Sequence, residues 1–182
     1  RQRRSRVEGV KKSASSPANT PALAALAKTS IPYRVHTYDN ESDHYGKEAA
    51  DVMVERLGVE PEQIFKTLVI ELAGKPAPGE SPLAVAVVPV TTTLTVKKAA
   101  AALGASKAHM AAVDLAEKTT GYVAGGISPL GQKRKLRTVI DESALLWDNI
   151  YVSGGRRGCD IEIAPADLIA LTDAIVADIA AQ

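Results

Sequence analysis

The sequence has one cysteine, few aromatic residues and no long apolar run. Cys159 cannot form an internal disulfide, so we expect a reducing compartment, the cytoplasm. No apolar segment is long enough to cross a bilayer, and none follows the basic N-terminus as it does in a secretory signal. These absences argue against a disulfide-stapled secreted protein and predict no association with a membrane.

The sequence also lacks the common motifs of hydrolases and nucleotide-binding proteins. It has no Gly-x-Ser-x-Gly nucleophile elbow, no Walker A sequence and no dinucleotide fingerprint. Cys159 lies in an alternating apolar run, which favours a small core residue over a catalytic thiol. The histidines and aspartates of residues 36–44 lack metal-ligand spacing, so we interpret them as part of a polar loop and expect no metal or cofactor.

The net charge of +1 is distributed unevenly along the chain. Residues 1–18 are basic and contain little apolar surface, so they are predicted to form a disordered extension. Residues 19–182 are long enough to form one domain with its own core. Two further basic clusters, Lys133–Arg137 and Arg156–Arg157, suit a phosphate backbone, although a solvated surface would explain either cluster alone.

Local patterning predicts an α/β fold with about six strands among about five helices. Strands are expected over residues 33–38, 64–72, 83–88, 136–140, 150–153 and 159–163. Helices are expected over 21–28, 46–57, 96–103 and 114–121, and from Pro165 through Ile179, where apolar residues form one stripe. The order of these elements is irregular, which favours a mixed, curled sheet with helices around it.

The most informative stretch is the strand expected at Gln63–Leu72. Its alternation places Lys66 on the same face as Leu68 and Ile70. A lysine on an apolar face either extends its ammonium group to water or is held in a pocket for a purpose. Downstream, the glycine-rich loop Gly125–Gly131 carries many backbone amides. We hypothesise that Lys66 and this loop face each other across one pocket.

Six stretches, in order over roughly residues 20–180, resemble the YbaK/EbsC family of freestanding aminoacyl-tRNA deacylases, which is related to the editing domain of bacterial prolyl-tRNA synthetase. They lie at His36–Asp39, Phe65–Leu68, Thr120–Tyr122, Gly125–Lys133, Ile150–Gly158 and Glu162–Pro165. The most similar branch is the Cys-tRNA(Pro)/Cys-tRNA(Cys) deacylases. The resemblance implies a mixed, barrel-like sheet of six or more strands, and hydrolytic removal of the amino acid from wrongly charged tRNA.

The resemblance also implies which residues form the site. Lys66 corresponds to the invariant lysine of the family, and Gly125 and Gly126 open its Gly-x-x-x-Pro loop, whose amides would support an oxyanion. The substrate pocket would further contain Tyr38, Tyr45, Ile127, Ser128, Pro129, Ser153 and Asp160. We hypothesise that Lys133, Arg134, Arg156 and Arg157 contact the acceptor stem of the tRNA.

No nucleophile is visible, and the resemblance implies that the cysteine thiol of the substrate attacks its own ester and releases a thiolactone. Orientation can contribute about 7–11 kcal/mol to such an intramolecular step. A water nucleophile remains an alternative. Prolyl-tRNA synthetase is the expected transient partner. Two other functions stay open: a related deacylase acting on another residue, such as Ala-tRNA(Pro), and a non-catalytic tRNA- or synthetase-binding module. A small-molecule hydrolase ranks below both.

Overall fold

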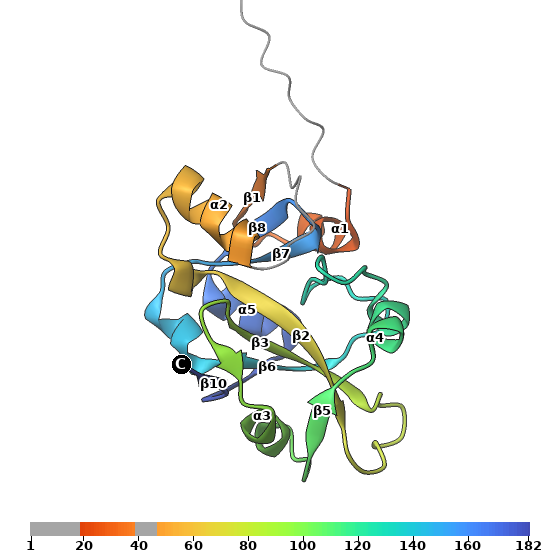
Figure 1. The fold of residues 1–182 in the computed structure, drawn as a ribbon. Coiled ribbons are helices and arrows are strands. Elements are labelled where there is room, and N and C mark those ends of the chain that lie inside the picture. Colours follow the sequence, from red (N-terminus) through yellow and green to blue (C-terminus); the bar gives the residue numbers. More distant parts are fainter. Residues whose placement is uncertain (1–18, 39–46) are drawn as a thin grey trace, which may run out of the picture.

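The computed structural model describes residues 19–38 and 47–182. The predicted N-terminal extension and Tyr45 lie outside these residues. Among the described residues no helix is both long and apolar enough to cross a membrane. Figure 1 shows a small sheet with α1 and α2 on one side of the molecule, and a larger sheet with α3 on the other.

The larger sheet has the strand order β5-β2-β3-β6-β9. Its centre is an antiparallel hairpin of β2 (Phe65–Leu72) and β3 (Leu83–Pro89), as predicted. β6 (Arg137–Asp141) and β9 (Ile175–Ala177) add to β3 in parallel. β5 (Ala108–Met110) pairs only with the last three residues of β2. Every residue of β3 is buried, because layers of the protein cover both of its faces.

Two smaller sheets complete the strands. β1 (Tyr33–Thr37), β8 (Cys159–Ile163) and β7 (Ile150–Arg156) form an antiparallel sheet in the order β1-β8-β7, and β4 (Thr93–Leu94) pairs with β10 (Ala180–Ala181). The mixed α/β class is confirmed. The strands do not close into one barrel, because only an isolated bridge, between Ile64 just before β2 and Tyr151 of β7, joins the large sheet to the β1-β8-β7 sheet among the described residues. The open edge of β2 is therefore left facing the small sheet.

Apart from the end of the last helix, the helices begin and end close to where local signals place them. They are α1 (Pro21–Ala27), α2 (Lys47–Leu57), α3 (Val96–Ala102), α4 (Val113–Thr120) and α5 (Pro165–Thr172), with short 3-10 turns η1 (Pro61–Gln63) and η2 (Glu142–Leu146). The Thr20 side chain accepts a hydrogen bond from the Leu23 amide, so Thr20 caps α1 as predicted. Gly121 ends α4 with a φ of 80°, a conformation that favours glycine.

Alternation along β2 divides its side chains between two cores. Phe65 and Val69 pack between the five-stranded sheet and the β1-β8-β7 sheet. Leu68 and Ile70 pack on the other face, against α3. Lys66 therefore projects from the face of Leu68 and Ile70, as its spacing predicts. A third, smaller cluster lies under α2 and includes Ile64, just before β2, and Tyr151 of β7.

The predicted last helix is wrong beyond Thr172. Asp173 adopts a left-handed conformation with a φ of 52° and ends α5. The chain then forms β9 and β10, so the apolar stripe expected on one helix is divided. Ile175 is exposed on β9, whereas Ile179 is fully buried in the core beside α3. Pairing of this segment with β6 and β4, distant in sequence, overrides the helical spacing.

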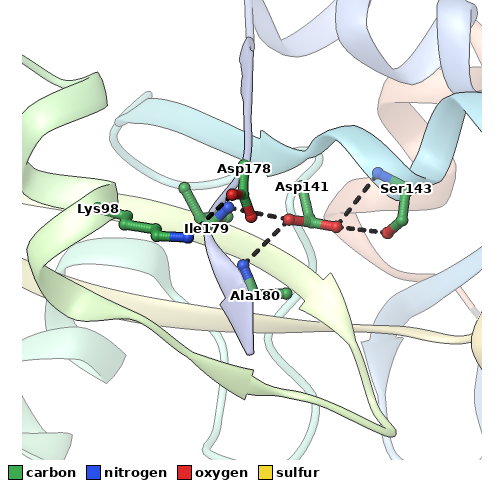
Figure 2. A network of polar contacts seen from close by, with 6 residues as sticks. All are labelled: Lys98, Asp141, Ser143, Asp178, Ile179 and Ala180. Atoms are coloured by element: carbon green, nitrogen blue, oxygen red, sulfur yellow. Dashed lines mark hydrogen bonds and ion pairs between the residues drawn. The ribbon is translucent and has the colours of Figure 1, made fainter. Parts of the chain in front are cut away.

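A buried carboxylate fixes the C-terminal segment (Figure 2). One oxygen of Asp141 accepts hydrogen bonds from the amides of Ile179 and Ala180, at 2.9 and 3.0 Å. The other oxygen accepts the amide and hydroxyl of Ser143, at 3.1 and 2.5 Å. Burial by itself would raise the pKa of Asp141, but these hydrogen bonds outweigh it and the pKa lies below its ordinary value.

Candidate active site

A cavity of about 380 Å³ opens where β2 lacks a neighbouring strand. β5 pairs with β2 only from Ile70 onward, and β7 meets it only at Ile64. The edge between these points faces the cavity, which we call the β2-edge cavity. Its other walls come from the β7–β8 hairpin, the start of α4 and the loop that follows α4. The unclosed sheet thus creates a cavity that is larger than the two others beside α1 and β6, of about 240 and 330 Å³.

Lys66 lies in the wall of the β2-edge cavity. Its ammonium group donates a hydrogen bond of 2.7 Å to the carbonyl oxygen of Thr92. Thr92 is held in the turn after β3, where its own hydroxyl donates to the Pro89 carbonyl at 2.8 Å. Burial lowers the pKa of Lys66 below its ordinary value. The cation is therefore fixed at the cavity wall instead of extending into bulk water.

Asp160 and Tyr38 form a hydrogen-bonded pair that also lines the cavity. Burial raises the pKa of Asp160 to about 6, although the hydrogen bond from Tyr38 works against this shift. Burial, and then the nearby Asp160 charge, raise the pKa of Tyr38 far above its ordinary value. Asp160 is the only acidic residue among the described residues that line the cavity. At neutral pH its carboxylate therefore provides a local negative charge in a largely basic site.

Ser153 lies directly opposite Asp160 in the register of β7 and β8, so the two side chains share a face of the small sheet. Both line the cavity. The Ser153 hydroxyl accepts a hydrogen bond of 3.2 Å from the Gly155 amide. Described residues lining the cavity include no histidine, so Ser153 has no imidazole base within this wall.

The glycine-rich loop contributes to the cavity only in part. Gly125 and Ile127 line it together with Lys66, so the structure brings the loop and the lysine to one cavity. Gly126 does not line it, and its amide donates to the Val123 carbonyl at 2.9 Å. A Cβ atom on Gly126 would lie 2.8 Å from the backbone of the β7–β8 hairpin. Gly126 therefore permits close packing of the loop on the hairpin, and its amide is already used.

Ser128 and Pro129 also lie behind the cavity wall. Ser128 is fully buried, and its hydroxyl accepts the Leu130 amide at 3.2 Å. Pro129 borders a separate cavity beside α1 and α5. These two residues shape the loop from within, whereas the sequence comparison expected them to contact substrate.

The two basic clusters occupy different positions. Arg156 and Arg157 line the β2-edge cavity. Lys133 and Arg134 lie outside it, and the Arg134 guanidinium donates to the Gly79 carbonyl at 3.2 Å. Of the predicted basic contacts, only the hairpin arginines adjoin the site directly.

Cys159 has the properties of a core residue. Only 1% of it is exposed, and its sulfur fills the space beside Gly154, where a Cβ would lie 2.5 Å from it. Burial raises the pKa of the thiol, which disfavours the reactive thiolate. Among the described residues, no three His, Cys, Asp or Glu side chains come together as a metal site would require.

Comparison with known proteins identifies the family. Residues 44–171 match the aminoacyl-tRNA editing domain. The chain belongs to this family. EbsC of Enterococcus faecalis, a candidate Cys-tRNA(Pro)/Cys-tRNA(Cys) deacylase, is 37% identical over 160 residues, which cover 88% of this chain and 92% of EbsC. The resemblance to the YbaK/EbsC family is thereby confirmed.

Solved structures share the fold of this editing domain. A candidate trans-editing enzyme for prolyl tRNA synthetase aligns with a TM-score of 0.74 at 23% identity, over 89% of this chain and 96% of that one. The hypothetical protein APE2540 aligns with a TM-score of 0.73 at 22% identity, over 88% of this chain and 99% of that one. At these identities the likeness shows the fold alone.

Two threonines of the editing domain were not found by sequence reasoning, one that holds Lys66 and one that lines the cavity. Thr92 acts through a backbone carbonyl, whose direction depends on a turn after β3 and leaves no side-chain signal. Thr67 follows Lys66 in the sequence and lines the same cavity. Its proximity to the lysine was visible, but nothing in the sequence showed that β2 would lack a neighbouring strand there.

Proposed function

We propose that this editing domain is a trans-acting deacylase that removes cysteine from wrongly charged Cys-tRNA(Pro), and also from Cys-tRNA(Cys). The observation that carries the proposal is the β2-edge cavity, which is lined by a fixed lysine, an aspartate and an amide-bearing loop. The relationship to EbsC supports the choice of cysteine. We propose that the protein acts in the cytoplasm, the compartment where charged tRNA is used.

Such an activity corrects errors that a synthetase makes when two amino acids are too similar for its binding pocket to separate. Cysteine and proline have similar bulk, and a pocket separates substrates that differ by one methylene by only about 1–3 kcal/mol. A second, hydrolytic site can exploit a chemical difference instead of size. The thiol of cysteine is that difference, because neither proline nor alanine carries one.

In the proposed reaction, the thiol sulfur of the substrate attacks its own ester carbonyl. A carbon–sulfur bond forms, the ester carbon–oxygen bond breaks, and the thiol proton ends on the terminal ribose hydroxyl of the released tRNA. The protein orients the reacting groups, for which such a step can gain about 7–11 kcal/mol. This chemistry needs no nucleophile from the protein, in keeping with a buried Cys159 and a Ser153 without a histidine partner among the described lining residues.

Each wall of the cavity has a role in this proposal. Lys66 anchors and orients the aminoacyl-adenosine end of the tRNA. The amides of Gly125 and Ile127 stabilise the oxyanion, because fixed donors need little reorganisation as charge develops. Asp160, with its partner Tyr38, holds the α-ammonium group of the cysteine. Tyr45 remains a proposed substrate contact outside the described residues.

The tRNA is expected to approach across the β7–β8 hairpin, where Arg156 and Arg157 meet the cavity. Lys133 and Arg134 would extend this contact along the acceptor stem. Backbone contacts of this kind carry little sequence information. We therefore propose that prolyl-tRNA synthetase, bound transiently, supplies the tRNA selectivity.

The proposal is tested with a panel of Cys-, Ser-, Ala- and Pro-tRNA(Pro). We expect rapid release of cysteine, detection of its thiolactone, and slow hydrolysis of Ser-tRNA despite the similar size of serine. Rapid turnover of Ala-tRNA without preference for cysteine would instead indicate the alternative deacylase. Binding of charged tRNA without turnover of any member would indicate a non-catalytic module.

A further inference from the structure

Thr67 carries a hydroxyl group that the fold leaves without a partner. The Thr67 side-chain oxygen is buried and accepts or donates no hydrogen bond; among the described residues the only other such side-chain atom is Nε2 of His36. An unpaired buried hydroxyl lowers the stability of a folded protein, because the group loses its hydrogen bonds to water. Thr67 lines the β2-edge cavity, so this unpaired group is part of the wall of the site.

The backbone of Thr67 also faces the cavity. Along β2 the Ile64 carbonyl accepts from Val90, toward β3, whereas the Val69 carbonyl accepts from Ala111, on the opposite edge. Backbone groups alternate along a strand, so Thr67 directs its amide and carbonyl to the same edge as Val69. Neither β5 nor β7 pairs with that edge at Thr67.

The residue is accessible through the cavity although its oxygen is covered. Thr67 as a whole is only partly buried. A rotation about χ1 moves the hydroxyl from its covered position to another staggered position. A ligand that enters the cavity can thus receive the hydroxyl without any movement of the backbone of β2.

We propose that Thr67 is a substrate-binding residue, whose hydroxyl donates a hydrogen bond to the carbonyl oxygen of the aminoacyl ester. This rests on the proposed deacylase function. The Thr67 amide, directed to the same open edge, is a second donor for that oxygen. An ester carbonyl accepts hydrogen bonds but donates none, which suits a wall that offers donors. Because every aminoacyl-tRNA has this carbonyl, Thr67 supports hydrolysis without selecting the amino acid.

The decisive variant is Thr67→Val, which replaces the hydroxyl by a methyl group of similar size. We expect kcat/KM for Cys-tRNA(Pro) to fall about five- to tenfold, the value of one hydrogen bond. The melting temperature should stay the same or rise, because the unpaired hydroxyl is removed. Thr67→Ser keeps the hydroxyl and should retain most of the activity. Any slower substrates in the panel should lose the same factor, so the preference for cysteine stays constant.

Thr172→Val is the matched control, because the hydroxyl of Thr172 is buried but donates to the Leu168 carbonyl at 2.7 Å. This control should melt at a lower temperature and keep its kcat/KM. The proposal for Thr67 is overturned if Thr67→Val has wild-type kcat/KM, if its preference for cysteine changes, or if both Thr67 variants lose activity together with several degrees of melting temperature.

A binding measurement separates this inference from the proposed function. Adenosine carrying cysteine through an amide in place of the ester keeps the carbonyl and is not hydrolysed. We expect it to bind Thr67→Val about five- to tenfold more weakly than the wild-type protein. If the wild-type protein hydrolyses no charged tRNA, the deacylase proposal fails, and this measurement still decides whether Thr67 binds an aminoacyl group. Equal dissociation constants would contradict that role.

Discussion

Lys66 brings a positive charge to the end of an apolar strand face, and the Thr92 carbonyl determines where that charge lies. We expect Lys66→Ala to abolish deacylation and Lys66→Arg not to restore it. A guanidinium is larger and planar, and it cannot reproduce a point charge 2.7 Å from that carbonyl. Single-turnover rates with Cys-tRNA(Pro) measure the effect. Lys97→Ala, an exposed lysine of α3, should keep the wild-type rate, and near-normal turnover by either Lys66 variant would refute the anchoring role.

Asp160 should make the activity depend on pH. Its pKa is raised to about 6, mainly by burial, so the carboxylate that is proposed to hold the α-ammonium group is lost as the pH falls through 6. We expect Asp160→Asn to lower kcat/KM at pH 7 at least tenfold. The ratio of wild-type to variant rates should fall toward one between pH 7 and pH 5. This ratio cancels the ionisation of the substrate thiol, which affects both proteins equally. A ratio that is constant over this range would contradict the assignment.

The raised pKa of Asp160 also affects the stability of the fold. The effect is opposite in sign to that of a salt-bridged aspartate, whose pKa is lowered. The folded protein binds the Asp160 proton more tightly than the unfolded chain does, so ionisation destabilises the fold as the pH rises from about 4 to about 6. Asp160→Asn should therefore raise the free energy of unfolding at pH 7, by about 3 kcal/mol. Together with Thr67, Asp160 indicates that the cavity wall is built at a cost to stability, as is common at functional sites.

At the scale of elements, the sequence predicts structures that depend on neighbouring residues and misses those that depend on contacts between distant segments. The β2–β3 hairpin, the cap of α1 and the end of α4 depend on neighbouring residues, and the sequence predicts each of them. β9 and β10 depend on pairing with strands far away in sequence, and the sequence places a helix there instead. Lys66 and Gly125 could be assigned to one cavity, whereas the engaged amide of Gly126 depends on loop geometry that spacing does not reveal.

Asp141 should be the main support of the C-terminal strands (Figure 2). We expect Asp141→Asn to lower the free energy of unfolding by about 2–4 kcal/mol, because it removes a buried charge that accepts several hydrogen bonds. The pKa of Asp141 is depressed in the folded protein, so its contribution is present above pH 4 and is lost as the pH falls through the lower, folded-state pKa. Urea denaturation between pH 2.5 and pH 7 measures both effects.

The matched control for Asp141→Asn is Asp178→Asn, at a residue that lies just before Ile179 and β10. Asp178 is exposed and forms a surface ion pair with Lys98 at 2.8 Å, so its removal should change stability little. Hydrogen exchange at the amides of Ile179 and Ala180 should accelerate in Asp141→Asn and stay slow in Asp178→Asn. If the acid-sensitive part of the stability curve is the same in Asp141→Asn as in the wild type, another group is responsible for it.

At the scale of the whole molecule, the proposed tRNA contact should appear in the salt dependence of the reaction. Each phosphate neutralised by a lysine or arginine adds about 0.7–0.9 to the slope of log affinity against log salt. We expect Arg156→Glu with Arg157→Glu to raise KM and flatten this slope by about two such contacts. Lys133→Glu with Arg134→Glu should act in the same direction, and more weakly, because these side chains lie outside the cavity.

The control is Lys75→Glu with Lys107→Glu, which changes the net charge by the same amount. Both lysines are exposed and lie outside the cavity lining, so this variant controls for long-range attraction. It should leave the slope almost unchanged, because exposed charges more than a Debye length of about 10 Å from the RNA are screened at 0.1 M salt. If the Lys133 and Arg134 variant keeps the wild-type slope, those residues lie outside the interface. If the Arg156 and Arg157 variant also keeps it, the acceptor stem does not cross the β7–β8 hairpin, and tRNA must enter the cavity from another side.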